Sequence, residues 1–99
     1  MGRSKIKTRL SPVAAAERLK NYSKYHMGNR RNISYSENNR EGRSKVGFAD
    51  PTGLFRQSHC LFIVEGDYDG GSIIESRSSG NFDGERRRII KELKDNERI

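Results

Sequence analysis

The chain has 99 residues, of which 31% are apolar and 33% are charged, and its formal net charge is +7. This length permits one small domain, and the low apolar fraction predicts a modest core in one half of the chain and a mobile remainder. The single cysteine, Cys60, excludes an internal disulfide and a multi-cysteine zinc site. No apolar run reaches the roughly 18 residues of a transmembrane helix, and the basic N-terminus lacks a signal-peptide core, so we expect a cytoplasmic protein without membrane contact.

The basic residues are concentrated in the first half of the chain. Residues 1–45 carry 12 Lys or Arg and three acidic residues, whereas residues 46–99 carry eight basic and ten acidic residues. A basic arm joined to a near-neutral domain is typical of polyanion binders, although a solvated, disordered tail would have the same composition. We therefore predict a partly disordered basic arm with one helix over residues 1–44 and a folded domain over 45–99. The arm residues expected to contact nucleic acid are Arg3, Lys5, Lys7, Arg9, Arg30 and Arg31.

The first predicted element is a helix. Residues 1–10 alternate basic and small side chains and are expected to be flexible. Ser11 and Pro12 then suit the N-cap and the first helical position, and Gly28 predicts the end of the helix. The helix has a thin apolar stripe, so packing against a partner should be needed to stabilise it.

The middle of the chain predicts a loop followed by strands. Residues 30–44 have almost no apolar side chains and read as a loop or linker. Residues 46–49 predict a short strand, and Leu54 and Phe55 are expected to pack back onto the domain that follows. The five consecutive apolar residues 60–64 predict a strand buried on both faces, as in a parallel or mixed sheet.

Two further helices are expected near the C-terminus. Residues 72–76 follow a glycine-rich loop and could begin a helix, which would complete a strand–loop–helix unit. Residues 83–96 predict a last helix with a narrow apolar face, and Asp83 and Glu85 suit its N-terminus. The predicted fold class is therefore α+β or α/β.

The loop after the apolar strand concentrates acidic and glycine residues. Glu65, Asp67 and Asp69 lie within five residues, at the end of a predicted strand where open α/β sheets bind ligands. Carboxylate oxygens so arranged suit Mg²⁺, which takes one or two carboxylates plus waters and phosphates. The alternative is a plain hairpin turn, since Asp69-Gly70 is a favoured turn pair. The residues alone leave both interpretations open.

This segment resembles the first motif of the Toprim domain of type IIA DNA topoisomerases, such as DNA gyrase B subunits and phage topoisomerase large subunits. That motif is an apolar strand, then Glu-Gly-Asp-Ser-Ala-Gly-Gly-Ser, then a basic residue after a short gap. The matching positions here are Glu65, Gly66, Asp67, Gly70, Gly71, Ser72 and Arg77.

The resemblance implies a role for each matching residue. Glu65 would be the catalytic glutamate, and Glu65 with Asp67 would bind Mg²⁺. Gly70, Gly71 and Arg77 would contact DNA, and residues 45–99 would form a partial Toprim-like domain.

The sequence also departs from the Toprim pattern. Tyr68-Asp69 replaces Ser-Ala, Ile74 stands where the gyrase pattern has Lys, and the later Asp-x-Asp metal pair is absent. The resemblance therefore implies a split or truncated fragment of the topoisomerase large subunit. Such a fragment would contribute Glu65 and DNA contacts to Mg²⁺-dependent DNA cleavage and rejoining, together with complementing subunits. The alternative is a small basic phage-type protein that binds nucleic acid, or inhibits a nucleic-acid enzyme, without catalysis.

Overall fold

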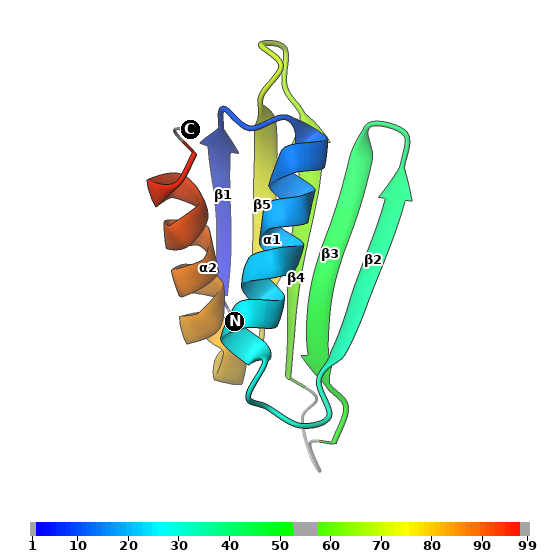
Figure 1. Cartoon of the computed structure of the whole chain (residues 1–99), viewed down its shortest axis with the longest axis vertical. Helices are drawn as coiled ribbons and strands as arrows, with labels where there is room; N and C mark the ends of the chain where they lie inside the picture. The colour runs from blue at the N-terminus through cyan, green and yellow to red at the C-terminus, as the bar shows by residue number, and fades with distance from the viewer. Residues whose placement is uncertain (1, 53–57, 98–99) are drawn as a thin grey trace.

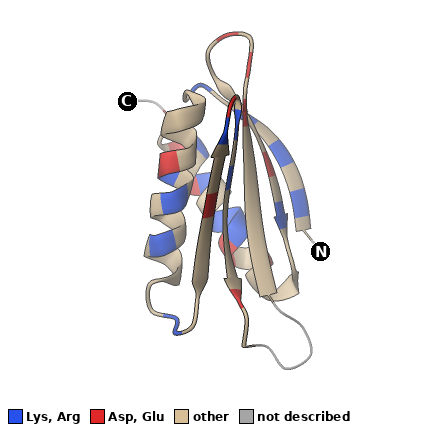
Figure 2. Ribbon diagram, turned by 90° about the vertical axis from the view of Figure 1, so that its right-hand side faces the viewer, with Lys and Arg blue, Asp and Glu red and all other residues tan. Residues whose placement is uncertain are grey.

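Two helices cover one face of a five-stranded antiparallel sheet in the computed structural model, which describes residues 2–52 and 58–97. Figure 1 shows both helices in front of the sheet, and Figure 2 shows the two layers nearly edge-on. The α+β class is confirmed. The elements in chain order are β1 (Gly2–Thr8), α1 (Pro12–Met27), β2 (Ser34–Arg40), β3 (Arg43–Asp50), β4 (Ser58–Gly66), β5 (Ser72–Ser78), the 3₁₀ turn η1 (Gly80–Phe82) and α2 (Asp83–Asp95).

The strands lie in the order β1-β5-β4-β3-β2. Strands β2 to β5 are hydrogen-bonded to their neighbours along the chain, whereas β1 pairs with β5, so the first and last strands lie side by side (Figure 1). The predicted boundary between residues 44 and 45 falls inside β3, and strands from both sides of it belong to this one sheet.

Both helices follow their sequence signals. Ser11 is the N-cap of α1, where its Oγ accepts a hydrogen bond from the Ala14 amide at 3.3 Å, and Pro12 is the first helical residue. Gly28 ends the helix, as predicted. Helix α2 spans Asp83–Asp95, which confirms the expected last helix to within one residue.

The core lies between the sheet and the helices. Strand β4 contributes Cys60, Phe62 and Val64 to it, and the helices contribute apolar side chains such as Leu19 and Ile89. Burial raises the pKa of the Cys60 thiol to about 12, so this cysteine is a neutral, inert core residue. The predicted packing of Leu54 and Phe55 lies outside the described residues.

The expectation of a flexible N-terminal segment is wrong, because Gly2–Thr8 form an edge strand. Its side chains alternate: Ser4, Ile6 and Thr8 point to the helices, while the basic side chains between them point to solvent. The alternation of basic and small residues in this segment therefore reflects the two-residue period of a β-strand, in which successive side chains point to opposite faces of the sheet.

The helix expected after the glycine-rich loop is also wrong, since Ser72–Ser78 form β5. Pairing on both sides, with β1 and with β4, outweighs the helical interpretation of Ile73 and Ile74. The sheet is antiparallel throughout these pairings, not parallel or mixed. Residues 34–40, predicted as a loop, form β2, which is exposed along its whole length.

Candidate nucleic-acid interface

The sheet has one face without helices, called the open face from here on. Side chains from the five strands meet there in three rows that cross the sheet, and each row spans roughly 19 Å. Seven Lys or Arg and two Glu occupy these positions. From β1 to β2, the rows are Arg3, Arg77, Leu61, Gly47, Ser36; then Lys5, Glu75, Ile63, Lys45, Asn38; then Lys7, Ile73, Glu65, Arg43, Arg40.

Some of the basic side chains on the open face have acidic partners. Arg77 contacts Glu75 at 2.7 Å, and this hydrogen bond lowers the pKa of the Glu75 carboxyl. Arg43 contacts Glu65 at 3.4 Å. Within residues 2–52 and 58–97, the basic side chains of the open face that form no ion pair are Arg3, Lys5, Arg40 and Lys45.

The centre of the open face is apolar. Ile63 is only 4% exposed although no helix covers it, because its cross-strand neighbours are the long side chains of Lys45 and Glu75. Leu61 and Ile73 are half-buried beside it. In the three rows there is no aromatic side chain on which a base could stack. The exposed ring of His59 lies on the same face of β4, two residues before Leu61.

The acidic loop is a hairpin turn between β4 and β5. The Asp67 amide donates to the Gly71 carbonyl at 2.9 Å, and the Gly70 amide donates to the Asp67 carbonyl at 3.2 Å. Gly70 has φ +86°, which favours glycine, and a Cβ on Gly71 would lie 2.4 Å from the Thr8 carbonyl oxygen. Both glycines therefore have structural reasons to be present.

The carboxylates of this turn contact basic side chains. Lys7 Nζ lies 2.9 Å from Asp67 and 3.1 Å from Asp69. Hydrogen bonds to these two carboxylates, Asp67 first, raise the pKa of Lys7. The pKa of Asp69 is lowered by the hydrogen bond from the Gly71 amide and then by Lys7. Glu65 points to a different partner, Arg43.

Mg²⁺ binding by Glu65 and Asp67 stays a prediction. Among the residues that the structure describes, no three His, Cys, Asp or Glu side chains are gathered so that they could hold a metal ion. The turn brings Glu65 and Asp67 to the same end of the sheet, where the Glu65 carboxylate is exposed, whereas the Asp67 side chain is only 11% exposed and contacts Lys7.

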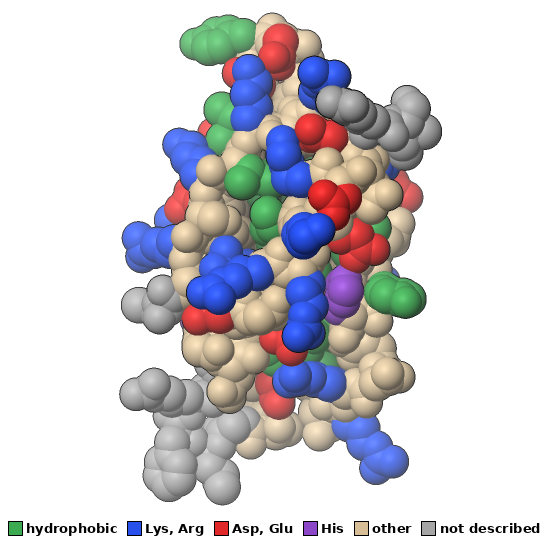
Figure 3. Space-filling view, turned by 90° about the vertical axis from the view of Figure 1, so that its left-hand side faces the viewer, with side chains coloured by type: hydrophobic (Ala, Val, Ile, Leu, Met, Phe, Trp, Pro, Cys, Tyr) green, Lys and Arg blue, Asp and Glu red, His purple; other side chains and the backbone are tan. Residues whose placement is uncertain are grey.

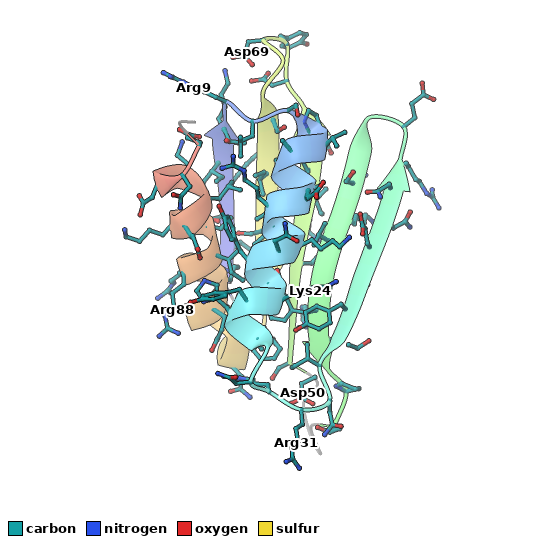
Figure 4. The ribbon with its side chains drawn as sticks, viewed as in Figure 1. Arg9, Lys24, Arg31, Asp50, Asp69 and Arg88 are labelled. Carbon is teal, nitrogen blue, oxygen red and sulfur yellow. The ribbon has the colours of Figure 1, made fainter. Side chains whose placement is uncertain are left out.

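The structure places the predicted DNA-binding residues in three regions. Arg3, Lys5, Lys7 and Arg77 share the open face. Arg9 and Asp69 lie at the end of the molecule that carries the hairpin turn with Gly70 and Gly71 (Figure 4). Arg31 lies at the opposite end near Asp50 (Figure 4). Arg30 follows α1 and contacts Glu85 at 3.0 Å, away from the open face.

Three basic residues of the open face escaped the sequence analysis: Arg40, Arg43 and Lys45. Arg40 and Arg43 lie in the segment predicted as a loop, and Lys45 follows it directly, so their common orientation was not predicted. The signal that could have found them is the two-residue spacing of Arg43 and Lys45 next to the apolar residues of β3.

No protein-family model matches the chain, and no curated protein sequence is significantly similar to it. Neither α1 nor α2, the helices of the described residues, combines the length and the apolar character needed to cross a membrane.

Proposed function

We propose that the protein binds nucleic acid by contacting backbone phosphates with the open face. The observation that carries the proposal is the placement of Arg3, Lys5, Arg40 and Lys45 near both side edges of this face, without acidic partners among the described residues. Basic side chains displace counterions from a polyanion, which supplies most of the affinity of non-specific binding.

The chemistry of the open face favours phosphate contact over base reading. Aromatic rings, which stack on single-stranded bases, are absent from its three rows, and His59 lies beyond them on the same face. Its long, flexible side chains suit phosphate oxygens, which carry no sequence information. We expect affinity to depend steeply on salt and little on sequence.

The first prediction concerns two lysines of the middle row. The double variant Lys5→Glu, Lys45→Glu should bind a short labelled duplex at least tenfold more weakly, because two phosphate contacts become repulsive. The slope of log affinity against log salt should fall by about two. Fluorescence anisotropy across a salt series measures both quantities.

The matched control changes net charge equally but elsewhere. The double variant Arg31→Glu, Arg88→Glu alters exposed side chains on the loop after α1 and on α2 (Figure 4). It should keep most of the affinity of the wild type. Equal weakening by the two double variants would show that only total charge matters, and the open face would not be the interface.

We also propose, as a second candidate, the topoisomerase fragment that the Toprim resemblance implies. It is favoured by the carboxylates of Glu65, which is exposed, and Asp67 at one end of β4, and by the position of Arg77 on the open face. In this function Mg²⁺ would be held jointly with ligands from a complementing subunit. A Mg²⁺ titration that follows the amide signals of residues 65–72 separates it from the first proposal.

A further inference from the structure

A basic groove lies on the other side of β1 from β5, between this edge strand and α2. It has a volume of about 540 Å³, and four basic and no acidic side chains line it. Figure 3 faces this side of the molecule and shows Lys and Arg side chains spread across it. The four basic residues are Arg3, Arg86, Arg87 and Lys91.

Arg86 forms the floor of the groove and is only 4% exposed. Its Nε donates to Ser78 Oγ at 2.8 Å, and its Nη1 donates to Ser4 Oγ and Ser76 Oγ, both at 3.2 Å. All three acceptors are neutral hydroxyls. A buried charge usually requires an opposite charge as well as hydrogen bonds, because desolvation of an unpaired ion is costly.

The carboxylate of Asp83 is linked to Arg86 through the Ser78 hydroxyl, and the Ser78 hydrogen bond, followed by smaller contributions that include the Arg86 charge, lowers the pKa of Asp83. Asp83 accepts hydrogen bonds from the Gly2 amide at 3.1 Å and from the Ser78 hydroxyl, and in the described part of the chain it forms no ion pair with Arg86. The remaining guanidinium nitrogen, Nη2, donates no hydrogen bond to a described residue. It lies beside Gly2, where an added Cβ would be 2.5 Å away.

The rim of the groove adds further positive charge. Arg3 and Arg87 are exposed and form no ion pair within the described residues. Lys91 contacts Asp95 at 2.7 Å through a largely exposed side chain, a pairing that contributes little in water. An anion in the groove would thus meet one desolvated guanidinium and up to three mobile cations.

We propose that this groove binds a phosphate group. A guanidinium donates to two oxygens of a phosphate at once, and several surrounding cations suit its double charge better than the single charge of a carboxylate. The groove lies between β1 and α2, and Arg3 is the one lining residue that it shares with the rows of the open face. The phosphate has two possible sources, a nucleic-acid backbone that continues around the β1 edge or a small phosphorylated molecule.

The second prediction tests the groove with inorganic pyrophosphate. Titration followed by NMR should shift the Arg86 Nε–H signal and the Gly2 and Ser4 amides in a saturable manner, while chloride at matched ionic strength should not. Arg87→Glu should weaken this binding about tenfold, because a cation at the rim of the groove becomes an anion that repels the ligand.

Arg88→Glu is the matched control, because the neighbouring side chain on α2 is exposed and does not line the groove. It should leave pyrophosphate affinity within about twofold of the wild type. Absence of a saturable shift in Arg86, or equal losses in the two variants, would overturn the proposal and leave Arg86 as a structural link between α2 and the sheet.

A competition experiment distinguishes the two sources of phosphate. If pyrophosphate displaces a short duplex, the groove holds a backbone phosphate; if both bind together, it takes a separate phosphorylated ligand. The Lys5→Glu, Lys45→Glu variant should still bind pyrophosphate in either case. Loss of duplex binding alone in this variant would therefore count for the open face, whereas loss of its pyrophosphate binding would count against a separate phosphate site in the groove.

Discussion

The side chains of the β4–β5 turn determine what the Toprim resemblance could mean in this chain. Asp67 and Asp69 share the ammonium group of Lys7, and Glu65 contacts Arg43. The Lys7–Asp69 and Arg43–Glu65 pairs are exposed and therefore weak. The Asp67 side chain is only 11% exposed, so a divalent cation bound to its carboxylate would have to displace Lys7 from a largely shielded contact. Whether Mg²⁺ binds here also depends on how many oxygen ligands the turn can supply, because Mg²⁺ prefers six.

The third prediction concerns Glu65 and belongs to the topoisomerase candidate. Millimolar Mg²⁺ should shift the NMR signals of the amides of residues 65–72 with saturation, and Glu65→Ala should abolish the shifts. Lys7→Ala should make the shifts appear at lower Mg²⁺, because the competing ammonium group is gone.

Glu75→Ala provides the control for that titration, since this carboxylate is also on the open face but outside the turn. It should leave the Mg²⁺ response unchanged. If the turn is ordered and its amides do not respond to Mg²⁺, the topoisomerase candidate is wrong. Phosphate binding by the open face would then remain as the proposed function.

At the scale of elements, the turn between β4 and β5 packs against the end of β1. Gly71 lies so close to β1 that an added Cβ would be 2.4 Å from the Thr8 carbonyl oxygen. The Ser72 hydroxyl donates to the Leu10 carbonyl at 2.8 Å. The turn thus fastens the edge strand and the start of the α1 connection to the centre of the sheet.

The fourth prediction follows from this packing. Gly71→Ala should lower the free energy of unfolding by about 1–3 kcal/mol, because its Cβ would overlap a backbone carbonyl that cannot move away without disturbing β1. Urea unfolding measures the change. Gly84→Ala is the control: its Cβ would meet nothing within 4 Å on α2, so stability should rise by about 0.5–1 kcal/mol. A Gly71→Ala variant as stable as the wild type would contradict the close approach of turn and strand.

The elements with local signals could be predicted from the sequence, and those that depend on distant partners could not. The Ser11-Pro12 cap, the buried strand within β4 and the apolar face of α2 each identify themselves within a few residues. Strands β1 and β2 lack an apolar face wide enough to reveal them, since each lies at an edge of the sheet.

The candidate site was partly predictable for the same reason. Arg3, Lys5, Lys7 and Arg77 were singled out by charge or by resemblance, but their alignment on one face follows from the pairing of β1 with β5. That pairing joins residues about 70 positions apart, and no local pattern specifies it.

At the scale of the whole molecule, β1 completes both the sheet and the polar cluster around Arg86. Ser4 accepts from Arg86, and Lys7 contacts the turn, so the strand is joined to α2 and to the β4–β5 hairpin. Its loss would expose β5 as a new edge and leave the Arg86 guanidinium less solvated by protein groups.

The fifth prediction tests this integration. A variant that lacks residues 2–8 should lose its cooperative unfolding transition, as measured by circular dichroism during heating. The control Arg3→Ser, Lys5→Ser keeps the strand, so its stability should change by no more than about 0.5 kcal/mol, while its affinity for a duplex falls. If the shortened chain unfolds with an unchanged midpoint, residues 2–8 are an appendage and not part of the folded unit.

The neighbourhood of β1 and β5 has a consequence for synthesis on the ribosome. Residues 2–8 can pair with β5 only after residues 72–78 have left the exit tunnel. At roughly 5–20 residues per second, this is a delay of several seconds. Until then the nascent chain carries a free basic segment next to the anionic ribosomal RNA. During this interval the lysines and arginines of β1 are attracted to the ribosomal RNA, the same kind of polyanion that the finished sheet is proposed to bind.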